Sequence, residues 1–277
     1  MGYATLLVHV EADDDGKARV ALAAGLARQM DAALVGVAAR DIVPPLTASA
    51  AGPVIVAALL AVEKNGIQAN LDAAEQHFWA VAGNDDKRTV WRSSIDNPAE
   101  ALARESRAAD LIIVGRRPEH ASPSRHADPG DVLMRAGRPV LVVPPGLSHL
   151  DAASVVVAWT DSRESRRAVA DALPLLRRAA SVLVLEVCNT ESEQADAAAA
   201  VEDVAGRLSR HGVRATAEAR ILREASVSAE LLLAMEQHRA GLVVAGGYGH
   251  SRPQEWAFGG LTRTLLRQCP KCCLLSH

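Results

Sequence analysis

The chain has 277 residues, so two domains are the first expectation, because the commonest single domains are shorter. Its formal net charge of −3, with both signs interspersed, excludes the strong basic field of a nucleic-acid-binding surface. Hydrophobic residues make up 49% of the chain but aromatic residues only 3%. Ala, Val and Leu supply the apolar content, which favours helices packed on buried parallel strands over an all-β sandwich.

The N-terminal residues show no signal for export. The sequence MGYATLLVHVEADDD has no basic segment followed by an apolar core and a small-residue cleavage site. No apolar stretch reaches the roughly 18 residues that cross a bilayer. We therefore expect a cytoplasmic protein whose partners include neither a membrane nor a nucleic acid.

The first half of the chain alternates short apolar strands with helices. Strands are expected at 5–10, 33–38, 109–115 and 139–143, a loop at 44–53 and a helix at 62–81. Prolines at positions 144 and 145 end the last of these strands, because proline continues neither element. We place the domain boundary at about residue 148, which gives domains 1–147 and 148–277.

The second half has the same order of elements. Strands are expected at 154–159, 181–188, 213–222, 241–246 and 271–276, with helices at 165–180, 191–208 and 226–237 between the first four. Pro174 should kink the first of these helices. Short continuous apolar strands that alternate with helices indicate parallel pairing with right-handed crossovers.

The two halves also resemble each other in sequence. Three pairs of segments match in order: Thr5–Val10 with Ser154–Trp159, Ala33–Ala38 with Val182–Val187, and Ala109–Gly115 with Ala240–Gly246. Such self-similarity is typical of a duplicated domain. We therefore predict an α/β protein of two Rossmann-like domains, each a five-stranded parallel sheet with helices on both faces.

Two glycine clusters follow the fourth strand of the second half, at Gly246-Gly247-Tyr248-Gly249 and at Gly259-Gly260. Ligands of open parallel sheets bind at the carboxyl ends of the strands. Glycine there permits positive φ and close approach of a ligand, and a helix that starts near Gly260 presents unpaired N–H groups. The spacing alone is typical of either a phosphate cradle or a tight turn, since it is neither a P-loop nor a GxGxxG motif after the first strand.

The arrangement resembles the universal stress protein family, in particular its tandem bacterial members. In that family the fourth strand runs into Gly-x2-Gly-x9-Gly-Ser/Thr, and Gly246, Gly249 and Gly259 stand in the same register here. The stretches Tyr248–Arg252, Phe258–Arg263 and Ala158–Glu164 are also similar to it. The resemblance implies a fold of the adenine nucleotide α-hydrolase type and, in nucleotide-binding members, ATP with Mg²⁺ across the ends of strands one and four.

The resemblance also implies positions for a nucleotide in the second half. Thr160 stands where a family aspartate closes the first strand, with Asp161 one residue later, and Val187 would offer its backbone to adenine. The ribose and phosphates would be lined by a set of small residues, namely Gly246, Gly249, Gly259, Gly260 and the hydroxyl of Thr262. Gly260 replaces the Ser/Thr of the motif, so backbone donors survive where side-chain oxygens do not.

The first half departs further from the motif. Gly115 is followed by Arg116, Arg117 and Pro118, and proline removes an N–H and fixes φ where the second glycine would stand. Asp131, after Gly130, would repel a phosphate. We expect this half not to bind ATP in the manner of the family and to serve as a packing partner, although its two arginines could reach an anion.

Three cysteines near the C-terminus, Cys269, Cys272 and Cys273, suggest a metal or redox site by their spacing. The repeat aligns residues 270–274 with the final core strand at 139–143, so we expect Cys272 and Cys273 to be small buried residues and only Cys269 to be placed for oxidation. The acidic run Asp13–Asp15 is expected to be a solvated turn. We predict no metal site.

Other polar and aromatic residues near the glycine clusters have two readings. His250 and Arg252 could touch a phosphate or lie in a solvated loop, and Trp256, Phe258 and Trp159 could form a contact surface or a small core. No nucleophile with a base partner, and no HExxH or paired catalytic acids, stands at a recognisable spacing. Catalysis beyond slow ATP hydrolysis is therefore not expected.

Two functions stay open at this stage. The first is a stress-response regulator that binds an adenine nucleotide in its second half and an unknown protein partner. The second is an interaction module without nucleotide, in which the glycine loops are relics and the domains form a homodimer surface. The intact glycines favour the first, whereas Gly260 and the displaced Asp161 favour the second.

Overall fold

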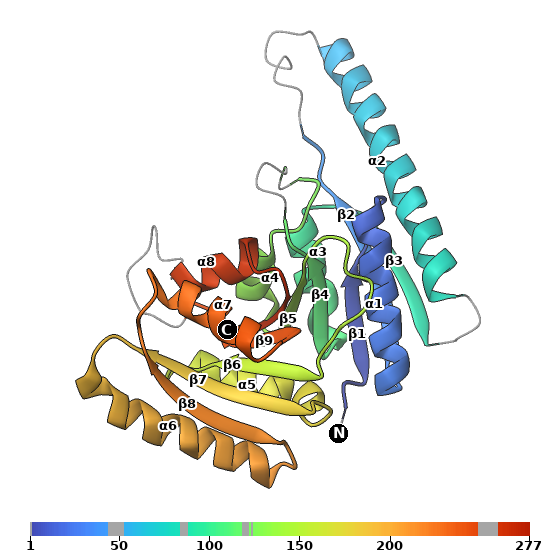
Figure 1. The fold of residues 1–277 in the computed structure, drawn as a ribbon. Helices are drawn as coiled ribbons and strands as arrows, with labels where there is room; N and C mark the ends of the chain where they lie inside the picture. The colour runs from blue at the N-terminus through green and yellow to red at the C-terminus, as the bar shows by residue number, and fades with distance from the viewer. Residues whose placement is uncertain (1, 44–52, 84–87, 118–121, 123, 249–259) are drawn as a thin grey trace. The chain divides into compact units, whose positions relative to one another are not determined.

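The computed structural model describes residues 2–43, 53–83, 88–117, 122, 124–248 and 260–277 (Figure 1). These residues form two compact units. The N-terminal unit comprises Tyr3–Ala136 with Pro145–His149, and the C-terminal unit comprises Leu150–His277 with Gly137–Pro144 and the first two residues. The sequence boundary near residue 148 stays a prediction.

The N-terminal unit contains four strands and four α-helices. Their bounds are β1 Thr5–His9, α1 Asp14–Met30, β2 Ala33–Arg40, α2 Pro53–Ala82, β3 Thr89–Ile95, α3 Pro98–Glu105, β4 Leu111–Gly115 and α4 Pro129–Ala136. A short 3-10 turn, Ser106–Ala108, follows α3. The strands pair in parallel in the order β3-β2-β1-β4.

The C-terminal unit repeats this pattern and adds a strand. Its elements are β5 Val140–Val143, β6 Ser154–Ala158, α5 Arg163–Leu176, β7 Ser181–Cys188, α6 Glu191–Arg210, β8 Ala215–Ile221, α7 Val227–Gln237, β9 Leu242–Gly246, α8 Gly260–Arg267 and β10 Cys272–Ser276. The strand order is β5-β10-β9-β6-β7-β8. All pairs are parallel except β5 with β10, where Val142 lies opposite Cys273.

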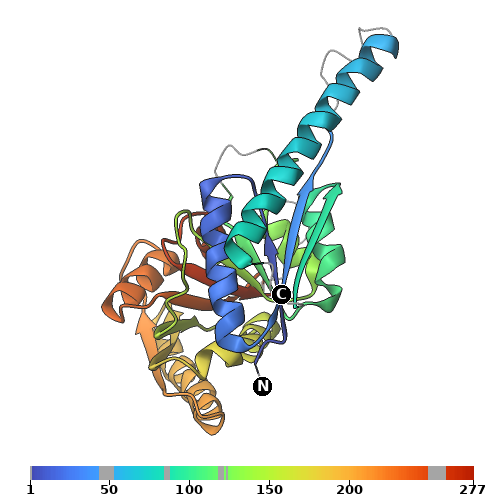
Figure 2. The ribbon, with the colours of Figure 1, turned by 90° about the vertical axis from the view of Figure 1, so that its right-hand side faces the viewer.

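The α/β class and the doubly wound arrangement are confirmed. Helices α1 and α2 cover one face of the N-terminal sheet and α3 and α4 the other, as Figure 2 shows. The structure also contains one pairing that the sequence pattern does not predict, because β5 pairs antiparallel with β10. Both strands are buried, so an antiparallel partner completes the sheet without leaving an apolar edge exposed.

The central strands form the core of each unit. Residues 111–114 of β4 and 242–244 of β9 are completely buried, which is typical of parallel strands covered on both faces. The outer strands β3 and β8 are only half-buried and carry polar side chains. The carboxyl ends of the central strands are therefore held by a rigid core.

Side-chain caps fix where several helices begin. The Asp13 carboxylate accepts a hydrogen bond from Gly16 N at 2.6 Å, so the expected acidic turn starts α1. Asp15 accepts one from Gly146 N at 2.9 Å. Ser162 and Ser226 cap α5 and α7 in the same way. Pro174 lies in the last turn of α5, which ends at Leu176 rather than at the expected residue 180.

Helix α2 is longer and more apolar than the sequence predicts. It begins at Pro53, nine residues before the expected start, and extends beyond the sheet of its unit (Figures 1 and 2). Residues Val54–Ala82 are long and apolar enough to cross a membrane, which corrects the expectation that no stretch reaches that length. Length and composition are weak evidence for a span, since Ile67, Leu71 and Phe78 of the same helix are buried in the core.

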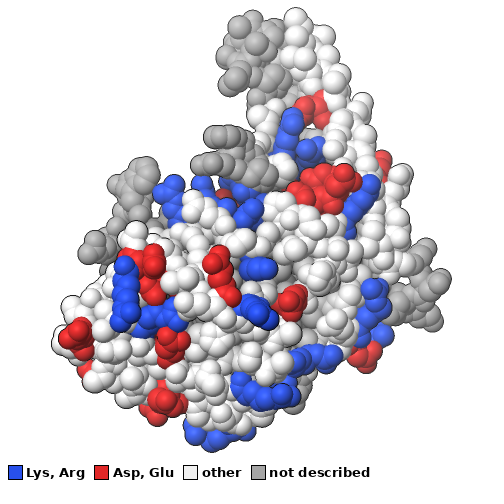
Figure 3. Space-filling model, in the orientation of Figure 1, with Lys and Arg blue, Asp and Glu red and all other residues white. Residues whose placement is uncertain are grey.

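The outer turns of α2 are exposed and nearly uncharged. Val54 is 81% exposed and Val62 70% exposed, and Figure 3 shows this end of the helix almost without coloured side chains. Elsewhere on the face in view, basic and acidic side chains are interspersed. The hydrophobic residues of α2 thus divide into an exposed outer group and a buried inner group.

Phe78 joins α2 to β2. Its ring is completely buried and lies against Gly36, where a Cβ atom would come within 2.6 Å of it. Trp79 and Trp91 contact the same ring, at centroid distances of 5.1 and 5.4 Å. Glycine at position 36 therefore makes room for the aromatic cluster.

Phe78→Ala should lower the free energy of unfolding by about 3–5 kcal/mol, because it leaves a cavity in this cluster. Val62→Ala on the exposed end of the same helix should change it by less than about 0.5 kcal/mol. Chemical denaturation followed by circular dichroism measures both. Equal effects of the two changes would contradict the division of α2.

Candidate functional site

The order in which successive strands join the C-terminal sheet reverses at its centre. From β6 the chain runs outward through β7 and β8 on one side, and then returns to β9 on the other side of β6. Ligands of open parallel sheets bind at such a point, outside the carboxyl ends of the strands. Thr160 lies two residues beyond β6 and Gly246 ends β9, so both predicted residues lie at this edge.

Ser165, in the first turn of α5, lies next to both residues. Its hydroxyl is 3.3 Å from that of Thr160, and a Cβ atom at Gly246 would come within 2.6 Å of its backbone nitrogen. Gly246 does not have positive φ, so the expected conformational reason for this glycine is wrong. Glycine is needed there because α5 approaches the end of β9 so closely.

The start of α8 lies beside the end of β9. The Thr262 hydroxyl is buried and accepts a hydrogen bond from Tyr248 N at 3.5 Å, which joins the two segments. Tyr248 has φ of 61°, a left-handed conformation in the turn after the strand. Gly260 is the first residue of α8, and no atom of the described residues lies within 4 Å of the position of its missing Cβ. Within the described part of the chain, nothing covers the N-terminus of α8 at Gly260.

Several predicted residues lie outside the described part of the chain. They are Gly249, Gly259, His250, Arg252, Trp256 and Phe258. Trp159 is described and is buried at the end of β6, where its indole N–H has no hydrogen-bond partner among the described residues. It lines a groove of about 570 Å³ between α5 and α6 together with Asp161 and Arg166.

The two remaining predicted residues lie at the ends of β6 and β7. Asp161 is exposed and forms an ion pair with Arg166 of α5, so its carboxylate already has a cationic partner. Val187 is half-buried and pairs with Arg220 of β8. Next to it, Glu186 was missed by the sequence reasoning: burial raises the pKa of its carboxyl, and the charge of Asp161 raises it further. Glu186 thus adds a second carboxyl group, besides Asp161, on this side of the edge.

The equivalent edge of the N-terminal unit is occupied by a buried arginine. Arg19 of α1 is 3% exposed, donates from Nε to the His9 carbonyl at 2.8 Å, and forms an ion pair of 2.6 Å with Glu11. A Cβ atom at Gly115 would lie 2.1 Å from its guanidinium. The end of β4 is therefore in contact with the chain's own cation.

The carboxylate of Asp128 caps the N-terminus of α4. Asp128 accepts hydrogen bonds from Gly130 N at 2.9 Å and from Asp131 N at 3.4 Å. Its other oxygen forms an ion pair of 2.9 Å with Arg117. The anion that Arg117 contacts is thus the carboxylate of Asp128. This carboxylate also occupies the N–H groups at the start of α4 that would otherwise be available to a phosphate.

His9 and Glu11 form a buried polar cluster with Arg19 and His126. Burial lowers the pKa of His9 to about 4, and the charge of Arg19 contributes to this shift against the attraction of Glu11. Burial raises the pKa of Glu11, but the neighbouring His9, the hydrogen bond with His126 and the charge of Arg19 together lower it below its ordinary value. At neutral pH the cluster therefore holds a neutral His9 beside an ionised Glu11.

The cysteines are packing residues. No disulfide links the four cysteines and all of them are buried; Cys269 is only 1% exposed, so the expectation that it is placed for oxidation is wrong. Burial raises the pKa of the Cys272 thiol to about 12, which keeps it protonated. Among the described residues, no three His, Cys, Asp or Glu side chains are grouped as a metal site would require.

Together these features define a duplicated Rossmann-like protein, and in its second copy no described residue covers the helix N-terminus at the switch point. Residues 153–277 match the model of the universal stress protein family. This region is therefore similar to that family, and the first half of the chain repeats its order of strands and helices. No curated protein matches the sequence.

Solved structures support the two-domain fold. A universal stress protein from Archaeoglobus fulgidus DSM 4304 is similar over 98% of this chain and 95% of its own, with a TM-score of 0.68 and 13% identity. A protein of unknown function from Pseudomonas aeruginosa PAO1 is similar over 99% and 92%, with a TM-score of 0.57 and 14% identity. At these identities the likeness establishes the fold alone.

Acidification should destabilise the N-terminal unit through His9. Because the unfolded state binds a proton at His9 below its ordinary pKa and the folded state does so only near pH 4, stability should fall between about pH 6.5 and 4. One such proton corresponds to a slope of about 1.4 kcal/mol per pH unit. Denaturant unfolding at a series of pH values should show His9→Gln with a slope smaller by about this amount, and an unchanged slope would contradict a neutral buried His9.

Asp128→Ala should lower the free energy of unfolding by about 0.5–2 kcal/mol, since it removes the cap of α4 and the partner of Arg117. Asp14→Ala is the matched control, because the Asp14 side chain is fully exposed and lies 3.5 Å from Lys17. The control should stay within about 0.5 kcal/mol of the parent chain. Thermal melts and denaturant titrations measure both, and equal losses would argue against the cap.

Proposed function

We propose that this chain is a tandem universal stress protein of the cytoplasm, and that its second half binds an adenine nucleotide such as ATP. The observation that carries the proposal is the N-terminus of α8 at Gly260, which no described residue covers and which lies at the switch point, joined to the end of β9. Among the described residues, no carboxylate accepts a hydrogen bond from the first N–H groups of α8. These groups and the helix dipole favour a phosphate.

The contrast with the first half supports this assignment. There, Asp128 occupies the corresponding helix terminus and Arg19 contacts the glycine at the end of β4. Internal carboxylates therefore already make the hydrogen bonds and ion pairs that the phosphates of a nucleotide would make there. The nucleotide is accordingly proposed for the second half alone.

The proposed contacts are mostly with the backbone. N–H groups near Gly246, Gly249, Gly259 and Gly260 would bind phosphate and ribose, and the backbone at Val187 would face adenine. The hydroxyls of Thr160 and Thr262 already contact Ser165 and Tyr248, and Asp161 is paired with Arg166. Mg²⁺ would be held mainly through the phosphates, as is common for nucleotide-bound Mg²⁺.

The second candidate is an interaction module that binds no nucleotide and acts through an unknown protein partner or a homodimer. The engagement of Thr262 and Asp161 by neighbouring residues favours it, because these side chains are not free to bind a ligand. In both candidates the role is regulatory, since the described residues at the C-terminal edge supply no nucleophile with a general base.

Nucleotide released from the purified chain and identified by mass spectrometry, together with calorimetric titration of ATP and Mg²⁺, separates the two candidates. Bound adenine nucleotide and saturable heat support the first. If neither is found at millimolar ATP, the chain is an interaction module.

Gly260→Ser should strengthen ATP binding about tenfold, because it adds a hydroxyl donor where the space is open. Gly206→Ser is the matched control. Gly206 lies in the same unit, near the C-terminal end of α6, and only the Arg210 side chain comes within 4 Å of the position of its missing Cβ. The control should leave affinity unchanged. Calorimetry on the two variants provides the test, and equal affinities would argue against a phosphate at Gly260.

A further inference from the structure

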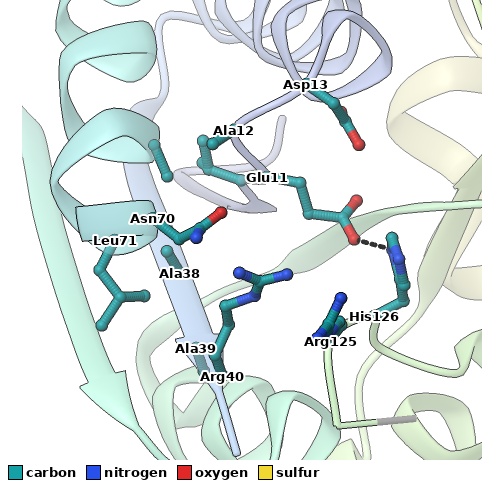
Figure 4. Close-up of a pocket in the computed structure, with 12 residues that line it drawn as sticks. Glu11, Ala12, Asp13, Ala38, Ala39, Arg40, Asn70, Leu71, Arg125 and His126 are labelled. Carbon is teal, nitrogen blue, oxygen red and sulfur yellow. Dashed lines mark hydrogen bonds and ion pairs between the residues drawn. The ribbon is translucent and has the colours of Figure 1, made fainter. Parts of the chain in front are cut away.

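A cavity of about 180 Å³ lies in the N-terminal unit, at the carboxyl ends of β1 and β2 (Figure 4). Its walls come from the turn before α1, from the inner part of α2 and from residues 125–126. It contains Ala38, which matches Val187 in the sequence repeat. Its volume is below the roughly 300–1,000 Å³ of pockets for drug-sized ligands, so it suits a molecule smaller than a nucleotide.

Two arginines face this cavity without an internal partner. Arg40 is the last residue of β2, and Figure 4 shows its guanidinium pointing into the cavity between Asn70 and Arg125. Neither the Arg40 nor the Arg125 side chain forms a hydrogen bond or ion pair with another described residue. Burial lowers the pKa of Arg40, and the like charge of Arg125 lowers it further. Both guanidinium groups thus retain their donors.

The acidic residues of the cavity are already engaged. Glu11 contacts Arg19 at 2.6 Å and accepts a hydrogen bond from His126, as the dashed line in Figure 4 marks for the latter. Asp13 accepts a hydrogen bond from Gly16 N at the start of α1. Their charges offset Arg40 only at a distance, and no carboxylate among the described residues contacts either cavity arginine.

We propose that this cavity is a binding site for a small oxyanion, with a phosphate or carboxylate group held between Arg40 and Arg125. Paired guanidinium groups present several N–H donors in a fixed plane, which suits the oxygens of either group. The site lies in the half for which no nucleotide is proposed, and it uses side chains rather than a glycine motif. It therefore stands independently of nucleotide binding in the second half.

Calorimetric titration of the full chain with inorganic phosphate and, separately, with malonate tests this site in a low-salt buffer free of both. Saturable binding of one probe supports the site and identifies its head group. Binding should weaken at least about tenfold in Arg40→Gln and in Arg125→Gln, because each loses charged hydrogen bonds. Absence of binding by both probes at millimolar concentrations would overturn the proposal.

Arg28→Gln is the matched control, with the same change of charge in the same unit. Arg28 lies in the last turn of α1, at the end of the helix away from the cavity. The Arg28→Gln chain should therefore bind the probes as the parent chain does. An equal loss in this control would show general screening of charge rather than a site.

Thermal melts separate binding from a structural role. Since the repulsion between Arg40 and Arg125 acts against the distant attraction of Glu11, Glu63 and Asp13, each glutamine variant should melt close to the parent chain when no anion is added. The binding probe should raise the melting temperature of the parent chain and of Arg28→Gln, but not that of the two cavity variants. A lowered melting temperature without anion, and no response of the parent chain to either probe, would assign the arginines to stability alone.

Discussion

The close approach of the first helix of each unit to the end of the fourth strand determines the rest of the site. At Gly246 the backbone of Glu164 and Ser165 leaves no room for a Cβ atom, and at Gly115 the Arg19 guanidinium leaves none. A larger residue at either position would push the helix away from the sheet. The glycines that end β4 and β9 are therefore packing residues first, and the approach they allow brings the end of the first strand beside that of the fourth.

The two halves share this geometry but differ in the charge of the side chains at its two polar positions. The N-terminal half carries Arg19 at the switch point and the carboxylate of Asp128 at the start of α4, so both polar positions are filled from within. The C-terminal half has a neutral Ser165 in the first position and, in the second, Gly260, which no described residue covers. In the N-terminal half, the carboxylate of Asp128 satisfies N–H groups at the start of α4 that have no partner within the helix.

Much of the fold could be predicted from the sequence because it depends on local patterns. The expected bounds of the strand at 181–188 agree with β7, and other strands differ by one or two residues. The start of α2 was missed because its outer turns are apolar on all sides and exposed, so no periodic pattern separates them from a loop. The pairing of β5 with β10 was missed because a sheet partner more than 100 residues away leaves no mark in either strand's pattern.

The candidate site was harder to predict than the fold, because its occupants are set by tertiary contacts rather than by local patterns. The spacing of Gly246 and Gly260 could be read directly, but the occupants of the N-terminal edge could not. Arg19 lies within an amphipathic helix, where an arginine is ordinarily a surface residue, and only the tertiary structure turns it toward His9 and Glu11.

The same separation of local and tertiary signals explains the cavity at Arg40. With Glu11 bound to Arg19 and His126, and Asp13 bound to Gly16, the acidic residues that the sequence places nearby are no longer available as partners. The half-buried Arg40 and the exposed Arg125 then line the same small cavity, and burial and repulsion by the like charge of Arg125 lower the pKa of Arg40 against the attraction of Glu11, Glu63 and Asp13. An oxyanion removes that repulsion, which gives the first half a reason to retain both arginines although it has lost the glycine motif.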